Sequence, residues 1–352
     1  EAYSKEVVLK VEQLTKHYPV KAGVFGHSDK VVHALEDVSF ELHRGETFAI
    51  VGESGCGKST TGKCILRLTE PTSGKAILDG EDFTALKGEA LTKARQKMKL
   101  IFQDPYSSLN PRMTVSDIIA EPIDIAGTYK TKAERDARVE EIMKAVGLDL
   151  EFKYRYPHEF SGGQRQRIGI ARAIVLEPEI VVCDEPVSAL AVSVQAKVIN
   201  LLIALQKKLG LSYIFISHDL SVVKHISDTV MVMYLGHTME LASKKDLYAN
   251  PLHPYTKALL DVIPRIRHER IQDKKILEGD VPSPTNPPKG CVFHTRCTSC
   301  MKVCTERAPE MHEVEPGHFC TCHLFDKDLT KAERQLELNE TLAAEEKADA
   351  LS

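Results

Sequence analysis

The chain carries the sequence Thr-Phe-Ala-Ile-Val-Gly-Glu-Ser-Gly-Cys-Gly-Lys-Ser from Thr47 to Ser59. The part that begins at Gly52 fits the pattern G-x-x-x-x-G-K-[ST]. It lies between an apolar run that predicts a strand and a segment with helical periodicity. In that setting, a glycine-rich loop and the first turn of a helix direct backbone N–H groups at phosphate oxygens. The sequence therefore predicts a nucleoside-triphosphate site, with a purely structural glycine-rich turn as the alternative.

Each residue type in this loop has an expected role. Gly55 and Gly57 allow the backbone to curve around the β-phosphate. Lys58 is expected to reach the β- and γ-phosphates, and the Ser59 hydroxyl is expected to bind Mg²⁺. The other loop residues expected to contact the nucleotide are Gly52, Ser54, Cys56 and Thr60.

The composition of the 352-residue chain narrows the classes of function. Its length predicts about two domains. The net charge of −4 argues against nucleic acid as a partner, because nucleic-acid-binding surfaces carry an excess of positive charge. The longest apolar runs, such as 201–205, are far shorter than the roughly 20 residues that span a bilayer, and no signal-peptide pattern is present. We expect a soluble, intracellular protein that reaches any membrane through a partner.

Two adjacent carboxylates, Asp184 and Glu185, follow the apolar run Ile180–Cys183, which predicts a buried strand. Asp184 is suited to a role at Mg²⁺, and Glu185 is placed to orient or deprotonate the attacking water. A strand followed by an ordinary acidic turn is the alternative interpretation.

Three further residues complete the predicted site. Gln103 ends a predicted strand, and its amide oxygen is a candidate Mg²⁺ ligand beside Ser59 and Asp184. His218 follows another predicted strand and is a candidate contact for the γ-phosphate and the water, with a structural histidine as the alternative. Tyr18 offers an aromatic face on which adenine can stack. The candidate catalytic residues are therefore Lys58, Gln103, Glu185 and His218.

A second phosphate site is predicted at the start of another helix, at Ser161, Gly162, Gly163 and Gln164. A serine hydroxyl and glycine N–H groups at a helix N-terminus suit phosphate. Because the chain already has one phosphate-binding loop, this second site would serve another chain. The sequence therefore predicts a head-to-tail dimer with ATP between the loop of one chain and the Ser-Gly-Gly segment of the other. A Ser161 that serves only as a helix N-cap is the alternative.

Strand-like and helical segments alternate along most of the chain, which predicts an α/β fold with a largely parallel sheet. Residues 7–50 are predicted to be rich in β-structure, and residues 114–147 to form a helical insertion. The proline-rich stretch 281–288 indicates a stiff linker or loop.

In combination and in order, these motifs resemble the ATP-binding subunits of ABC transporters, from Val7 to about Leu260. The segment Asn250–Leu260, which contains His-Pro-Tyr, resembles a hallmark of the oligopeptide and dipeptide importers, and the segment 103–112 is also typical of them.

The resemblance implies an α/β fold of the ABC-type P-loop NTPase class. This class combines a RecA-like parallel sheet, an antiparallel β subdomain and a helical signature subdomain, here at about 104–175. The resemblance also implies an ATPase domain over 1–260, a small cysteine-rich C-terminal domain over 261–325 and a charged tail over 326–352, which would form a solvated helix or fray.

The resemblance further implies partners. The chain is similar to the F-type ATPase subunit, which forms a heterodimer with a homologous D-type ATPase beneath two transmembrane permease subunits. An extracytoplasmic peptide-binding protein would deliver the solute, and the helical insertion would receive the permease coupling helices. The expected location is the cytoplasmic face of the inner membrane, as a peripheral subunit. ATP binding would close the dimer and hydrolysis would reopen it, giving alternating access.

Alternatives to peptide import remain open. The same subfamily contains importers of nickel, sugars and other small solutes. A non-transport ABC ATPase fits less well, because such proteins usually carry two ATPase cassettes or long coiled coils. A metal-sensing module with a vestigial ATPase is disfavoured by the presence of Lys58, Glu185 and His218.

One position departs from the family pattern. Where the family places an aspartate after the segment 186–190, this chain has Ala191. Alanine cannot make polar contacts across a dimer, so we expect slowed or unequal hydrolysis with ATP binding preserved. A naturally asymmetric pair of sites and an engineered substitution are both compatible with this residue.

Six of the nine cysteines lie between residues 291 and 322, which favours a metal site over disulfides in an intracellular protein. Four thiolates suit iron–sulfur or zinc equally, and Cys300, Cys320 and nearby histidines leave the ligand set open. The alternatives are zinc and free or oxidised cysteines. The resemblance implies a [4Fe–4S] cluster that acts as a structural staple, held by Cys291, Cys297, Cys304 and Cys322.

Overall fold

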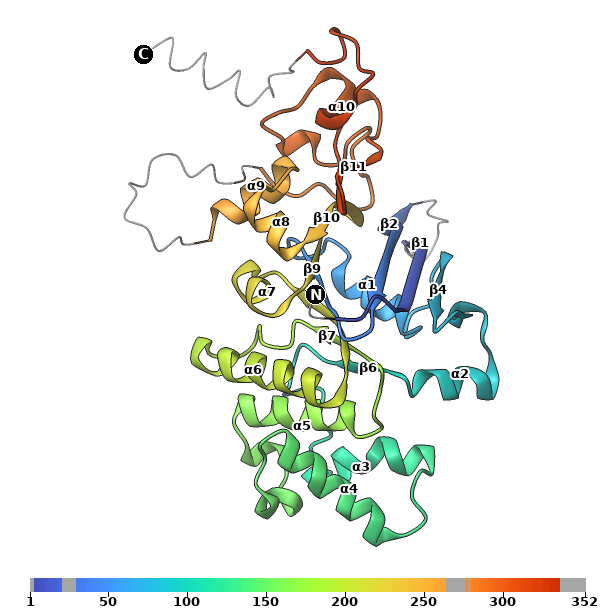
Figure 1. The fold of residues 1–352 in the computed structure, drawn as a ribbon, viewed down its shortest axis with the longest axis vertical. Helices are drawn as coiled ribbons and strands as arrows, with labels where there is room; N and C mark the ends of the chain where they lie inside the picture. Colours follow the sequence, from blue (N-terminus) through green and yellow to red (C-terminus); the bar gives the residue numbers. More distant parts are fainter. Residues whose placement is uncertain (1–2, 21–29, 264–276, 278, 336–352) are drawn as a thin grey trace, which may run out of the picture.

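The computed structural model describes residues 3–20, 30–263, 277 and 279–335, which form two β-sheets with flanking helices (Figure 1). The larger sheet has eight strands. They are β3 (Thr47–Val51), β6 (Met98–Ile101), β7 (Ile180–Asp184), β8 (Ser212–Ser217), β9 (Thr229–Tyr234), β10 (His237–Ser243), β11 (Met311–Glu315) and β12 (His318–Thr321). Their order is β11-β12-β10-β9-β3-β8-β7-β6.

The central strands of this sheet are parallel, from β9 through β3, β8 and β7 to β6. Every residue of β3, β7 and β8 is buried, because the sheet is covered on both faces and its strands are nearly continuous apolar runs. Successive side chains of a strand alternate between two core clusters, so that Val181 and Cys183 face one and Ile180 and Val182 face the other. The predicted α/β fold with a parallel sheet is confirmed.

The smaller sheet is antiparallel and has the order β2-β1-β4-β5. Its strands are β1 (Val7–Pro19), β2 (Val31–His43), β4 (Ser73–Leu78) and β5 (Glu81–Asp82). Its buried side chains share a core cluster with β3, β7, β8 and α1 (Lys58–Ile65). The rings of Phe40 in β2 and Phe48 in β3 stack with their centroids 4.4 Å apart, which ties the two sheets together. The predicted antiparallel β subdomain is therefore present.

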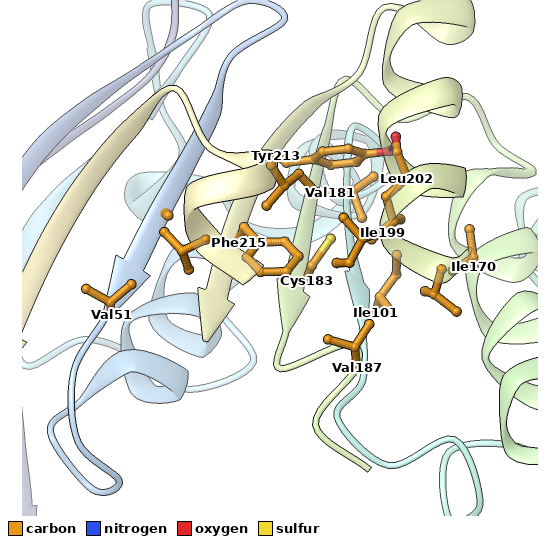
Figure 2. Packing of buried hydrophobic residues seen from close by; sticks show 14 of the residues in the cluster. Val51, Ile101, Ile170, Val181, Cys183, Val187, Ile199, Leu202, Tyr213 and Phe215 are labelled. Carbon is orange, nitrogen blue, oxygen red and sulfur yellow. Dashed lines mark hydrogen bonds between the residues drawn. The ribbon is translucent and has the colours of Figure 1, made fainter. Parts of the chain in front are cut away.

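Helices pack against the other face of the larger sheet. Figure 2 shows Ile170 of α5 and Ile199 and Leu202 of α6 beside the side chains of β7 and β8. The Tyr213 hydroxyl on β8 donates a hydrogen bond to the Leu202 carbonyl oxygen at 2.8 Å. The α-helices after α1 are α2 (Gly88–Arg95), α3 (Val115–Ala126), α4 (Lys132–Ala145), α5 (Gly162–Ile174), α6 (Val192–Leu209), α7 (Leu220–Ile226), α8 (Lys244–Ala249), α9 (Pro254–Asp261) and α10 (Lys302–Glu306).

The predicted helical insertion over 114–147 is formed by α3 and α4, which pack on α5 at the lower end of the molecule in Figure 1. Both helices begin with a threonine N-cap, Thr114 for α3 and Thr131 for α4. These caps satisfy backbone N–H groups that lack partners inside the helix, which fixes where each helix begins.

The C-terminal region joins the larger sheet. β12 pairs with β10 in antiparallel register, with Glu240 opposite Cys320. Cys291, Phe293 and Cys304 belong to the same core cluster as the α3–α7 face of the sheet. The small cysteine-rich C-terminal domain predicted over 261–325 is not confirmed as a unit: its described residues share a core with the larger sheet, and residues 264–276 and 278 lie outside the described part of the chain. Of the predicted tail, residues 336–352 lie outside the described part of the chain.

Candidate active site

The glycine-rich loop runs from the end of β3 into α1, as the sequence predicts. Gly52 and Gly57 have φ values of 152° and 101°, which residues with a Cβ rarely adopt. A Cβ on Gly52 would lie 2.3 Å from the Met233 carbonyl oxygen, and one on Gly57 would lie 2.6 Å from that of Ala34. The loop therefore needs glycine both for its backbone conformation and for the close approach of neighbouring strands.

Lys58 is the first residue of α1, and its ammonium group lies inside the loop. Its Nζ donates hydrogen bonds to the carbonyl oxygens of Gly52 at 2.9 Å and Glu53 at 3.1 Å. It also lies 3.9 Å from Glu185 Oε1, and the side chain is only 4% exposed. Because a buried charge interacts strongly with its surroundings, this ammonium is well placed to neutralise phosphate oxygens.

Ser59 and Asp184 meet at the junction of α1 and β7. The Ser59 hydroxyl donates a hydrogen bond to Asp184 Oδ1 at 2.7 Å. Burial raises the pKa of Asp184, and the hydrogen bond from Ser59 partly opposes this rise. A hydroxyl and a carboxylate in contact supply the oxygen ligands that Mg²⁺ prefers. This pair fits the predicted magnesium site.

Glu185 lies at the centre of the predicted catalytic residues. His218 Nδ1 lies 2.9 Å from Glu185 Oε2, and Gln103 Nε2 lies 3.5 Å from the same oxygen. The backbone of Glu185 has a φ of 44°. Its N–H donates to the Ile216 carbonyl oxygen at 2.9 Å, which anchors the residue against β8. The ends of β7 and β8 thus hold Glu185 beside the glycine-rich loop, with Oε1 3.9 Å from Lys58 Nζ. This position suits a base that accepts a proton from a water near the phosphates.

The predicted nucleotide contacts surround one cavity of about 920 Å³. Apart from Cys56 and Asp184, every residue predicted from the sequence to contact ATP lines it: Tyr18, Gly52, Ser54, Gly55, Gly57, Lys58, Ser59, Thr60, Gln103, Glu185 and His218. Cys56 is 3% exposed, and burial raises its pKa, so its thiol lies behind the loop. The structure thus brings together residues that span 200 positions of the sequence, from Tyr18 to His218.

Several residues of this region were not predicted. Val281 and Pro284, in the stretch interpreted from its prolines as a linker or loop, line the cavity. The Glu53 N–H donates to the Tyr255 hydroxyl at 2.9 Å. Arg296 donates two hydrogen bonds to the Glu53 carboxylate, at 2.7 and 3.2 Å. The His-Pro-Tyr pattern offered a signal for Tyr255, whereas nothing in the sequence pairs Glu53 with an arginine 243 positions away.

The Ser161–Gln164 segment forms the N-terminus of α5, away from this cavity. Ser161 is the N-cap, and its side chain and that of Gln164 form a capping box with the backbone. None of the four residues lines the cavity. Within one chain the structure therefore does not bring this segment to the glycine-rich loop.

Ala191 is the N-cap residue of α6 and provides no side-chain hydrogen bond to the helix. An aspartate, which the resemblance implies at this position, would be a favourable N-cap, and alanine cannot supply that hydrogen bond.

The four cysteines singled out in the sequence lie close together. The thiols of these four residues lie near enough to affect one another's charge, and so do two further thiols: Cys320 interacts with Cys291 and Cys322, and Cys300 with Cys304. Burial is the main reason that the pKa rises to about 12 for Cys291, about 11 for Cys297 and about 12 for Cys322. A hydrogen bond from Cys300 lowers the pKa of Cys304 to about 6.

The geometry of these thiols differs from that of a mononuclear zinc site. Zn–S bonds of 2.3 Å in a tetrahedron place sulfur atoms about 3.8 Å apart. Among the described residues, no three cysteine sulfur atoms lie within 4.8 Å of one another. The arrangement of the described residues therefore supports neither the zinc alternative nor the predicted [4Fe–4S] cluster.

Two family descriptions match the chain. Residues 35–188 match the ABC transporter family, and residues 239–304 match the family described as oligopeptide/dipeptide transporter, C-terminal region. No helix in the described part of the chain has the length and apolar character required to cross a membrane.

Curated relatives resemble nearly the whole chain. The oligopeptide transport ATP-binding protein AppF of Bacillus subtilis is 53% identical over 92% of this chain and 99% of its own length. A putative peptide import ATP-binding protein of Brucella ovis is 50% identical over 90% of this chain and 97% of its own.

Solved structures share the fold. The structure of cbiO1 from Clostridium perfringens, part of an ABC transporter complex, has a TM-score of 0.60 and 28% identity over 70% of this chain and 92% of its own. The dimeric structure of MJ0796, a bacterial ABC transporter cassette, has a TM-score of 0.59 and 29% identity over 67% of this chain and 98% of its own. From the extent and identity of these matches, the chain belongs to the ABC transporter family, among the ATP-binding proteins that carry the oligopeptide/dipeptide transporter C-terminal region.

Proposed function

We propose that this chain hydrolyses ATP to drive the import of peptides through an ABC transporter. The observation that carries the proposal is the convergence of Lys58, Ser59, Glu185 and His218 on one cavity. The choice of peptides rests on relatives named as oligopeptide and peptide import proteins, which align over nine-tenths of the chain or more.

Each residue then has a role in hydrolysis. Lys58 neutralises the β- and γ-phosphates, and Ser59, Asp184 and Gln103 hold Mg²⁺, which supplies positive charge at the phosphates when bound. Glu185 accepts a proton from the attacking water, while His218 orients the Glu185 carboxylate and contacts the γ-phosphate. Tyr18 stacks on adenine.

The second half of each ATP site comes from a partner chain in this proposal. Ser161, Gly162, Gly163 and Gln164 would contact the γ-phosphate bound by the opposite chain. Two observations support this: the segment lies on the surface away from the chain's own cavity, and MJ0796 was solved as a dimer. The finer form of the proposal is a heterodimer with a homologous D-type ATPase.

A peptide importer also implies membrane permease subunits. We propose two permease subunits, contacted by α3 and α4, and delivery of the solute by an extracytoplasmic peptide-binding protein. The chain would then lie peripherally on the cytoplasmic face of the inner membrane.

We also propose a [4Fe–4S] cluster held by Cys291, Cys297, Cys304 and Cys322, as the resemblance in the sequence implies. Four cysteines supply a complete ligand set, and the bound cluster would lower the pKa of each thiol and staple the C-terminal region. The test is iron and sulfide content after anaerobic purification. Cys297→Ser is expected to lose both, and Cys320→Ser to keep them; equal retention in the two variants would contradict the assignment.

ATP hydrolysis by the assembled transporter tests the proposed function. Hydrolysis should rise with a peptide-loaded binding protein and collapse in Glu185→Gln. Turnover that survives this substitution would place the chemistry in the partner ATPase. If hydrolysis rises with nickel or a sugar and not with peptides, peptides are not the transported solute.

A further inference from the structure

Two histidines and one glutamate meet on the smaller sheet, where none of them lines the ATP cavity. His17 Nε2 and His33 Nδ1 each lie 2.6 Å from the same oxygen, Glu36 Oε1. One ligand atom from each residue lies within 4.8 Å of the others, and in the described part of the chain this is the only such group of His, Cys, Asp or Glu.

Strand pairing brings these side chains together. In the register of β1 with β2, His17 lies opposite His33, and their ring centroids are 4.5 Å apart. The register shifts near this point, and the Glu36 N–H donates to the Gly236 carbonyl oxygen at 3.0 Å instead of to β1. The Glu36 side chain is therefore held between the two rings.

The chemistry of the group selects one class of ion. Imidazole nitrogen suits zinc and other divalent transition metals, whereas magnesium and calcium prefer sites made of oxygen ligands. The side chains are 30%, 31% and 24% exposed for His17, His33 and Glu36, so an ion can enter from solvent while the site stays partly shielded. Zn–N and Zn–O bonds of about 2.0–2.1 Å in a tetrahedron need ligand atoms about 3.3 Å apart, which requires the present contacts to open by less than about 1 Å.

We propose that His17, His33 and Glu36 form a binding site for a divalent transition-metal ion such as Zn²⁺, with the fourth position open to water. In the hydrogen-bonded state, His17 Nε2 and His33 Nδ1 each donate a proton to Glu36 Oε1. When the ion binds, both of these protons leave to solvent, and each neutral imidazole carries its one proton on the other ring nitrogen, Nδ1 of His17 and Nε2 of His33.

The site formed by His17, His33 and Glu36 lies next to the wall of the nucleotide cavity. One residue beyond the His17–His33 pair, Tyr18 lies opposite Val32, and both line the cavity. An ion held across β1 and β2 would therefore brace the cavity wall that carries the predicted adenine contact.

The test is binding of Zn²⁺ alone to the purified full-length chain, without nucleotide. Calorimetry gives affinity and stoichiometry, and wild type is compared with His33→Ala and with the near-isosteric Glu36→Gln. The C-terminal thiols are unchanged in all of these proteins, so any zinc that they bind cancels in the comparison. His43→Ala is the matched control, because His43 pairs with Glu46 at 2.9 Å with the same i,i+3 spacing as His33 and Glu36 but without a second histidine.

Both site variants are expected to lose one Zn²⁺ per chain or to bind it at least about tenfold more weakly, while His43→Ala matches wild type. Zinc should also raise the Tm of wild type more than that of His33→Ala, because binding to the folded state stabilises it. The Co²⁺ difference spectrum between wild type and His33→Ala should lack thiolate-to-metal bands. Equal zinc binding by wild type and both site variants, or an equal loss in His43→Ala, would overturn the proposal and leave a hydrogen-bonded bridge between the strands.

Discussion

The glycine-rich loop and the Ser161–Gln164 segment both begin a helix with phosphate-binding chemistry, yet their surroundings differ. Around the loop, side chains from several strand ends converge: Ser59 contacts Asp184, and Lys58 and His218 lie beside Glu185. Among the described residues, the Ser161 hydroxyl forms its hydrogen bonds with the backbone N–H and the side chain of Gln164, in its own helix. We call the glycine-rich loop with Asp184, Glu185 and His218 the rich half-site, and Ser161–Gln164 the bare half-site. One chain thus holds one of each, which is the arrangement expected if each ATP site is built from two chains.

Glu185→Gln gives the largest expected effect. Loss of the base should reduce ATP hydrolysis by about 100-fold or more, while ATP binding persists because Lys58 and Ser59 are unchanged. Steady-state hydrolysis and nucleotide binding measure the two properties. Glu179→Gln, at the opposite end of β7, is the control and should hydrolyse ATP normally. Wild-type turnover in Glu185→Gln would contradict the proposed role of Glu185 as the base.

Ser161→Ala tests the bare half-site directly. Ser243→Ala is a control, because the Ser243 side chain is the N-cap of α8 and accepts a hydrogen bond from the Asp246 N–H. Each substitution should cost roughly 1 kcal/mol of stability. Only Ser161→Ala should also reduce hydrolysis in the assembled transporter, by about tenfold or more, since one lost contact to the γ-phosphate in the transition state is worth at least this much. Equal hydrolysis by the two variants would show that Ser161 serves only as a helix N-cap.

The contact between Arg296 and Glu53 ties the C-terminal region to the glycine-rich loop, whereas in the described part of the chain the Ser161 hydroxyl forms its hydrogen bonds within the Ser161–Gln164 segment. Arg296→Met and Glu53→Gln, alone and combined, form a double-mutant cycle. We expect a coupling of about 1–3 kcal/mol in unfolding free energy, because the pair is bidentate and Arg296 is largely buried. ATP should also bind more weakly to both single variants. Additive effects in the cycle would show that the two side chains act independently.

Ala191→Asp has the smallest expected effect on stability. An aspartate N-cap on α6 should add about 1 kcal/mol, seen as a higher Tm. If the same carboxylate makes the polar contacts of the family across the dimer, turnover of the assembled transporter should also rise. Ala191→Ser supplies a cap without the charge and serves as the control. A gain in Tm with unchanged turnover would contradict the predicted effect of Ala191 on hydrolysis.

The sequence predicted those parts of the site that are encoded in contiguous segments. The loop from Gly52 to Ser59, the acidic end of β7 and the histidine after β8 each follow an apolar run whose strand character is locally evident. Parallel strands place their carboxyl ends at one edge of a sheet, so these segments had to meet once the fold class was known. The helical insertion was also predicted, because helical periodicity is a local pattern along the chain.

Other features depend on contacts that no local pattern encodes. In the C-terminal region, β12 adds to β10. There the carboxylate of Glu240, wholly buried, accepts a hydrogen bond from His318 at 2.7 Å and from the backbone N–H groups of Leu252 and His253. A buried carboxylate with several donors is a tertiary arrangement that the sequence shows only as one more glutamate.

The sequence by itself determined the family, the phosphate-binding loop and the residue types needed for hydrolysis, because these rest on spacings of a few residues along strands and helices. Only the tertiary structure decided that Arg296 holds Glu53 and that His17 and His33 share one oxygen of Glu36. Each of these contacts requires a strand register or a chain reversal that only the packed core enforces. Sequence separation carries no information about which side chains then face one another.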